Sequence, residues 1–126
     1  MAKNHSIRVL IADDHRLFTE ALDAILSADK RITVAATARN GKEAVDLERE
    51  LEPDVVLMDI DMPVMDGVEA ARRIRERRGK ACILMLTGSN ARSDVDRARR
   101  VGVAGYVTKD RIASELIDAI VEVARR

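Results

Sequence analysis

Short apolar runs alternate along the chain with longer amphipathic stretches. In one of these runs, Val55-Val56-Leu57-Met58, four apolar residues stand together, two of them β-branched, with turn signals on both sides. Such a run is typical of a strand that is buried on both faces, as in a parallel sheet. By similar patterns we predict further strands at residues 7–12, 32–38, 81–86 and 105–108.

The amphipathic stretches between the strands predict helices. Apolar side chains recur at helical spacing over residues 15–28, and Asp13 or Asp14 is available to cap that helix. Asn40 and Asp66 each stand three residues before a glutamate, which is the pattern of a capping box at a helix start. We therefore expect the second and third helices to begin just after these two residues.

The predicted helix over about residues 91–101 is poor in apolar residues, and Gly102 is placed as its C-terminal stop. Because few apolar contacts give low local stability, we expect this helix to be the loosest one. Its apolar stripe is limited to Ala91, Val95, Ala98 and Val101. The closing helix has the richer set Leu116, Ile117, Ile120, Val121 and Ala124.

Strands and helices alternate five times, which is the order of an α/β protein. This order calls for a parallel sheet with right-handed crossovers and helices on both faces. We predict a flavodoxin-like doubly wound (βα)5 fold whose five-stranded parallel sheet has the order 2-1-3-4-5. At 126 residues the chain is expected to form a single domain over residues 1–126, with a core over about 7–124.

Polar side chains follow four of the five predicted strands. Asp13 and Asp14 end the first strand, Asp59 the third, Thr87 the fourth and Lys109 the fifth. Loops that follow parallel strands open at one edge of the sheet, so we expect these side chains to meet at one mouth. The second strand contributes no such residue, which the order 2-1-3-4-5 explains by placing that strand at an edge.

Three carboxylates that converge need a positive charge near them, because like charges disfavour each other's ionised form. Oxygen ligands indicate a hard cation, and Mg²⁺ typically binds few carboxylates together with waters and a phosphate oxygen. Lys109 and Thr87 offer an ammonium and a hydroxyl suited to a transferring phosphoryl group. Asp59, central in the sheet, is the natural nucleophile. We interpret His15 as a neighbour of the site, because metal ligands and a nucleophile are already supplied.

Composition and charge narrow the classes of function. The 22 basic residues cancel the 22 acidic ones, which argues against attraction of the whole domain to nucleic acid or to an anionic membrane. The single cysteine, Cys82, excludes an internal disulfide and fits a reducing cytosol. The sequence has neither a signal peptide nor an apolar run near the ~18 residues of a membrane span. We therefore expect a cytoplasmic protein.

Taken in order, these residues resemble the receiver domain of bacterial two-component response regulators, over about residues 7–124. Some motifs are similar to the subfamily that usually carries a C-terminal helix-turn-helix output domain, although no output domain is expected in this chain. The motifs that match the family are Asp13-Asp14, Asp59 with Met62-Pro63 and Asp66-Gly67 behind it, Thr87-Gly88, and Gly105-Tyr106-Val107-Thr108-Lys109-Asp110. Those similar to the subfamily are Ala12-Asp13-Asp14-His15, Asp66-Gly67-Val68-Glu69-Ala70-Ala71-Arg72 and Gly105-Tyr106-Val107-Thr108-Lys109-Asp110.

The resemblance implies that Asp59 accepts a phosphoryl group from the phosphohistidine of a sensor histidine kinase or of a phosphotransfer protein. It also implies that Mg²⁺ is bound by Asp14, by Asp59 and by the backbone carbonyl of Asp61, and by Asp13 largely through water. The domain would then act on itself, by phosphotransfer and autodephosphorylation, and not as an enzyme with a separate substrate.

The resemblance further implies a switch. Thr87 and Lys109 engage the phosphoryl oxygens, and Tyr106 swings inward as Thr87 moves, which reshapes the interaction surface. The expected output is transcription regulation, with a homodimer on phosphorylation as one candidate assembly. Asp61 and Ser89 occupy variable positions that tune the lifetime of the acyl phosphate in this family.

Three alternatives remain at this point. Asp59 and Asp61 form an Asp-x-Asp pair that resembles haloacid-dehalogenase-like phosphohydrolases, but the pair ends the third strand and the chain has no room for a cap domain. A flavodoxin-like electron carrier needs aromatic residues to stack a flavin, and only Phe18 and Tyr106 are present. A receiver that signals without phosphate is disfavoured by the complete set of acids, threonine and lysine.

Overall fold

The computed structural model describes residues 6–88 and 92–125. Within these residues, five parallel strands form one sheet in the order β2-β1-β3-β4-β5, which confirms the predicted fold class and strand order. The strands are β1 (Ile7–Ala12), β2 (Ile32–Ala38), β3 (Val55–Asp59), β4 (Cys82–Thr87) and β5 (Gly105–Thr108). The helices are α1 (Arg16–Ser27), α2 (Gly41–Leu51), α3 (Gly67–Glu76), α4 (Arg92–Arg100) and α5 (Ile112–Ala124).

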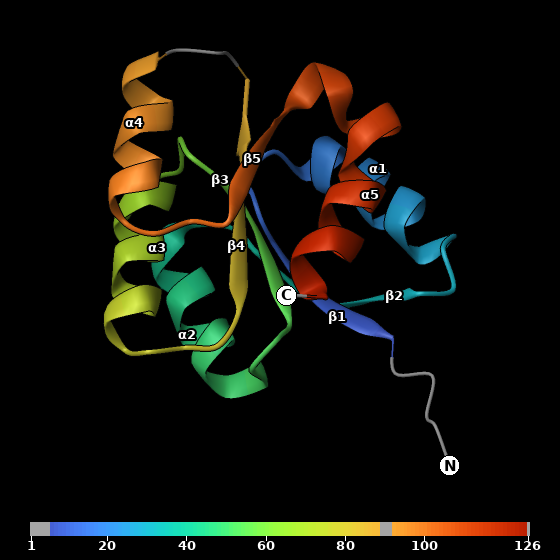
Figure 1. Cartoon of the computed structure of the whole chain (residues 1–126), viewed down its shortest axis with the longest axis horizontal. Helices are drawn as coiled ribbons and strands as arrows, with labels where there is room; N and C mark the ends of the chain where they lie inside the picture. The colour runs from blue at the N-terminus through green and yellow to red at the C-terminus, as the bar shows by residue number, and fades with distance from the viewer. Residues whose placement is uncertain (1–5, 89–91, 126) are drawn as a thin grey trace.

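The helices cover both faces of the sheet. Helices α1 and α5 lie on one face, and α2, α3 and α4 lie on the other, as Figure 1 shows. Each face has its own cluster of buried apolar side chains, with Leu22, Leu26 and Leu116 on the first and Val68 and Ile74 on the second. Strand β3 lies between β1 and β4, and all of its residues are buried. The residue that ends β3 is therefore fixed by packing on both faces.

Two of the predicted helix caps are confirmed. The side chain of Asn40 accepts a hydrogen bond from the Glu43 backbone N–H at 2.8 Å, and Asp66 accepts one from the Glu69 N–H at 2.8 Å. Each bond satisfies a backbone donor that the first turn of a helix leaves without an intrahelical partner. Asp66 thereby fixes the start of α3 immediately behind the end of β3.

The cap predicted for α1 is wrong. The N-cap residue is His15, whose side chain makes no capping bond, and Asp14 is not the cap either. Asp13 instead accepts the His15 backbone N–H through Oδ1 at 2.8 Å. The other oxygen of Asp13 accepts a hydrogen bond from Lys109 Nζ at 2.8 Å, so this carboxylate is held at the strand end and does not cap the first turn of α1.

Helix α4 buries little apolar surface, as its composition indicates, and its low stability stays a prediction. It contributes Ala98 as the buried residue of its described span, and it ends before Gly102, whose φ of 85° lies in the left-handed region. Of the predicted apolar stripe, Ala91 lies outside the described residues. After β5, a 3₁₀ turn over Lys109–Arg111 was not predicted, and it leads directly into α5.

In the described part of the chain, none of the helices combines the length and the apolar character that crossing a bilayer requires.

Candidate functional site

The predicted site residues lie at the C-terminal ends of neighbouring strands. Asp13 directly follows β1, Asp59 is the last residue of β3, and Thr87 is the last residue of β4. In the sheet register Asp59 stands beside Leu86, so Thr87 is one position further along the adjacent strand. Lys109 directly follows β5, whose Thr108 pairs with Thr87. The strand order thus gathers these residues at one edge of the sheet.

The side chain of Lys109 reaches into this edge. Its Nζ lies 2.8 Å from Asp13 Oδ2 and 3.5 Å from Asp59 Oδ1, and it also stands 4.4 Å from the centre of the Phe18 ring. Asp13 and Asp59 are both buried. An ammonium between two buried carboxylates offsets part of their mutual repulsion. It also leaves a cation positioned next to the candidate nucleophile.

Asp13, Asp14, His15 and Asp59 form an acidic cluster at the same edge. Each offers one donor atom, and these atoms all lie within 4.8 Å of one another. The His15 ring was expected only near the site, but its Nδ1 lies 2.8 Å from Asp13 Oδ1 and 3.4 Å from Asp14 Oδ1. The position of His15 directly after two acids was the available signal in the sequence. Nothing in the local pattern shows which way the ring turns.

The carboxylate of Asp59 is electrostatically unusual. The pKa of Asp59 is raised to about 6, first by burial of the group and then by the charge of Asp13, whereas Lys109 acts in the opposite direction. Asp59 is 4% exposed, and its Oδ2 has no hydrogen-bond partner among the described residues. A buried acceptor without a partner is costly in water-excluded surroundings. The donor set and this oxygen together fit a divalent cation with carboxylate ligands.

The imidazole of His15 responds to the same acids. Its pKa is raised, first by the hydrogen bond to Asp13 and then by the charges of Asp13 and Asp14. Asp13 and Asp14 also line an open pocket of about 300 Å³ between the start of α1 and the end of β2. The cluster is therefore accessible from the α1 side, although Asp13 itself is buried.

Comparison with known proteins identifies the family. The response regulator receiver domain matches residues 9–121 of this chain. This chain belongs to the response regulator receiver family. Its fold agrees with the resemblance drawn from the motifs, and the comparisons give no support to the haloacid dehalogenase alternative.

Several relatives of this receiver domain are regulators of transcription by name. The chain is 39% identical to the transcriptional regulatory protein LnrK of Bacillus subtilis over 93% of its own length and 53% of that protein. It is 37% identical to the transcriptional regulatory protein DegU of Brevibacillus brevis, covering 96% of this chain and 51% of DegU. A LuxR-family response regulator from Aurantimonas sp. SI85-9A1 superposes with a TM-score of 0.90 at 34% identity, covering 95% of this chain and 86% of that one. The chain spans about half the length of the curated relatives it matches.

In this receiver domain the loop after Asp59 brings the start of α3 very close to the end of β3. A Cβ added to Gly67 would lie 2.0 Å from the carbonyl oxygen of Asp59, so only glycine allows the start of α3 to approach β3 this closely. The Gly67 N–H donates to the carbonyl of Ile60 at 2.7 Å. Val64 in the same loop has a φ of 70°, which is strained for a β-branched residue. The side chain of Asp61 is exposed and does not belong to the acidic cluster.

The other predicted site residues lie in different surroundings. Thr87 is buried at the end of β4, whereas the Tyr106 side chain is 42% exposed. Tyr106 borders a surface pocket of about 450 Å³ shared with α4, whose lining includes Arg92, Val95 and Arg99. Ser89 lies outside the described residues. Of the predicted site residues, Asp13, Asp14 and Asp59 lie in the acidic cluster and Lys109 contacts it, whereas Tyr106 lies on the adjoining surface.

Proposed function

We propose that Asp59 accepts a phosphoryl group from the phosphohistidine of a sensor histidine kinase, or of a phosphotransfer protein. Response regulators work with sensor histidine kinases in two-component systems. One observation carries the proposal for this chain: the buried carboxylate of Asp59 ends the central strand with the Lys109 ammonium 3.5 Å from its Oδ1. Family membership and this geometry support the same function.

The two oxygens of Asp59 have different roles in the proposal. Oδ1 faces the Lys109 ammonium, whereas Oδ2 has no hydrogen-bond partner among the described residues. One oxygen of this carboxylate attacks the phosphorus atom as the bond from phosphorus to the donor's histidine nitrogen breaks and the imidazole leaves, while the other oxygen is left to the cation. Lys109 then holds a phosphoryl oxygen, because an ammonium aimed at developing negative charge stabilises it most in a water-poor site.

Asp14, Asp59 and the backbone carbonyl of Asp61 would hold Mg²⁺, and Asp13 would act largely through water. When bound, the ion neutralises charge on the transferred group. Asp13 also accepts a hydrogen bond from Lys109 at 2.8 Å, so it positions the lysine as well as the ligand set. Asp61 and Ser89 tune how long the acyl phosphate survives.

The proposed output is a change of surface around α4. A phosphoryl group brings a charge near −2 and strong acceptor oxygens to the strand ends. The Thr87 hydroxyl moves to that group, Tyr106 turns inward, and α4 shifts, because a weakly packed helix costs little to move. Homodimerisation and regulation of transcription in the cytoplasm would follow, through an output domain of the kind the longer relatives have room for.

Intact-mass analysis tests the proposal. The chain is incubated with a small acyl phosphate, with and without Mg²⁺, and is compared with the Asp59→Asn and Asp61→Asn variants. We expect one phosphoryl group on the wild type only with Mg²⁺, none on Asp59→Asn, and retained labelling in Asp61→Asn. Labelling of Asp59→Asn to the same extent would contradict the proposal, as would steady multiple-turnover hydrolysis of phosphate esters.

A further inference from the structure

The ring of His15 is held over the acidic cluster at two points. Its Nδ1 lies 2.8 Å from Asp13 Oδ1 and 3.4 Å from Asp14 Oδ1, and the His15 backbone N–H donates to the same Asp13 oxygen at 2.8 Å. The side chain is nevertheless 63% exposed, so burial does not dictate this position. The acids fix the ring nitrogen at the open side of the cluster.

One of these separations matches that of neighbouring ligands on one cation. Two donors in adjacent octahedral positions, each about 2.1 Å from the ion, stand about 3.0 Å apart. The 3.4 Å from His15 Nδ1 to Asp14 Oδ1, which would bind the ion directly, is close to that value, while the 2.8 Å to Asp13 Oδ1 is a hydrogen bond that holds the ring in place. The buried Asp59 Oδ2, which lacks a hydrogen-bond partner among the described residues, is an independent sign that the cluster accommodates a cation.

We propose that His15 Nδ1 is a metal ligand, and that with this nitrogen the site binds first-row transition cations more tightly than Mg²⁺. The inference rests on the proposed acidic metal site and adds a residue that sets its specificity. Mg²⁺ favours oxygen ligands and retained water, whereas imidazole is a favourable ligand for softer divalent ions. Among first-row divalent ions, the affinity of such a site rises from Mn²⁺ through Co²⁺ to Ni²⁺. Exchange of one water for His15 therefore benefits Co²⁺ much more than Mg²⁺.

The consequence concerns which ion supports phosphoryl transfer. A site with carboxylates alone depends on the abundant Mg²⁺, whereas a site with an added imidazole is filled by a transition cation at much lower concentration. The phosphorylation competence of Asp59 would then respond to the supply of that cation. His15 would act on the phosphorylation reaction through the metal ion and would not contact the phosphoryl group.

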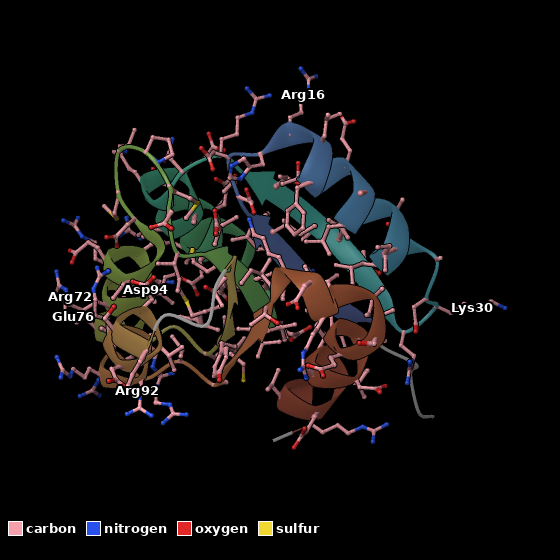
Figure 2. All side chains as sticks on the ribbon, turned by 90° about the horizontal axis from the view of Figure 1, so that it is seen from above. Arg16, Lys30, Arg72, Glu76, Arg92 and Asp94 are labelled. Carbon is pink, nitrogen blue, oxygen red and sulfur yellow. The ribbon has the colours of Figure 1, made fainter. Side chains whose placement is uncertain are left out.

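Metal titration of three proteins tests this specificity. Co²⁺ and Mg²⁺ are titrated by calorimetry, at one fixed pH, into the untagged wild type, His15→Ala and Arg16→Ala. Arg16 is the matched control because it follows His15 directly and its side chain, 81% exposed, extends away from the molecule in Figure 2. We expect His15→Ala to lose about tenfold or more in Co²⁺ affinity, with Mg²⁺ affinity little changed, and Arg16→Ala to change the affinity for both cations by the same small factor, because only its charge is removed.

A spectroscopic readout separates ligation from a general charge effect. Bound Co²⁺ should shift the ring proton signals of His15 strongly in the wild type, and its visible absorption should change in His15→Ala. Unchanged Co²⁺ affinity in His15→Ala overturns the inference. Tighter binding of both Co²⁺ and Mg²⁺ to His15→Ala than to the wild type also overturns it, because the imidazole would then serve only as a positive counter-charge.

The same titrations separate the inference from the proposed function. Normal Mg²⁺ binding with Co²⁺ affinity independent of His15 contradicts the inference alone. Absence of binding of either cation to the wild type contradicts the proposed acidic metal site as well, and the inference fails with it. Asp14→Asn provides the reference for loss of a carboxylate ligand and is expected to weaken the binding of both cations.

Discussion

Helices α4 and α5 flank the same edge of the sheet, on opposite faces, but they are anchored very differently (Figure 1). Helix α5 buries five of its residues, including Leu116 and Ile120, whereas Ala98 is the buried residue of the described α4. The polar character of α4 is visible in Figure 2, where the Arg92 side chain extends outward from it. Of the two helices that flank β5, α5 therefore buries much more apolar surface than α4.

This difference suggests how a signal would leave the site. Lys109 enters the acidic cluster from the turn that leads into α5, so its position depends on the well-anchored helix. Tyr106, three residues earlier, borders the surface pocket shared with α4. A receiver needs a rigid phosphorylation site and a surface that moves at low cost. The many apolar residues of α5 would keep the site rigid, and the few apolar residues of α4 would let its surface move.

The largest effect is expected from truncation in α5. Leu116→Ala removes a fully buried side chain and should lower the free energy of unfolding by about 3 kcal/mol, because such changes leave a cavity. Val95→Ala, on α4, should cost less than about 1 kcal/mol because Val95 is only partly buried. Urea unfolding at constant m-value measures both changes. Equal costs for the two variants would contradict the proposed difference in anchoring.

The second effect concerns the buried carboxylate of Asp59, at the end of β3. The pKa of Asp59 is about 6 in the folded protein against an ordinary value of 3.8, so the folded state binds its proton more tightly. Stability should therefore fall as the pH rises from about 4 to about 6, and the loss is complete above that window. Asp59→Asn removes the penalty and should stabilise the domain near pH 7 by no more than about 3 kcal/mol.

Unfolding of wild type and Asp59→Asn at pH 7.5 and at pH 4 checks this sign. The advantage of the variant should be present at the higher pH and nearly absent at the lower one. Asp61→Asn is the control, because its exposed side chain should change stability by less than about 0.5 kcal/mol at either pH. A pH-independent gain in Asp59→Asn would show that the buried charge is not its cause.

The fold follows from sequence because its signals are local. Apolar runs, alternation and caps such as Asn40 lie within a few residues of the structure they determine. The strand order, which follows from these local signals, is enough to bring Asp59 and Lys109 to the same edge of the sheet. Expectations for the roles of Thr87, Tyr106, Asp61 and Ser89 stay predictions, because a role depends on a second state of the molecule.

The features that sequence analysis missed depend on tertiary contacts. Glu48 of α2 is buried and forms an ion pair with Arg77, which lies 29 positions further along the chain, and no periodicity reveals such a partner. The ring of His15 turns toward Asp13, whose other oxygen accepts a hydrogen bond from Lys109 at 2.8 Å. The pattern of residues therefore identifies the chemical groups at the site, but not all of their pairings.

The smallest expected effect concerns an ion pair that holds α4 to the start of α3. Arg97 of α4 lies 3.1 Å from Asp66 Oδ2, while the other oxygen of Asp66 caps α3. The two side chains are 46% and 38% exposed, and exposed ion pairs contribute at most about 1 kcal/mol. Because α4 has few apolar contacts, this pair should be a noticeable part of its local stability. Arg97→Ala should therefore accelerate amide hydrogen exchange in α4 by no more than about fivefold and leave α5 unchanged.

A double-mutant cycle separates this ion pair from other effects of the substitution. Asp66→Asn keeps an oxygen to cap α3 but removes the charge, so it should accelerate exchange in α4 to a similar extent. The two changes together should be less than additive, because each alone already breaks the contact. High salt should reproduce part of the effect in the wild type. Additive effects would mean that the two side chains do not interact. Faster exchange spread equally over α4 and α5 would mean that α4 opens only when the whole domain unfolds, and that it is not a separate moving element.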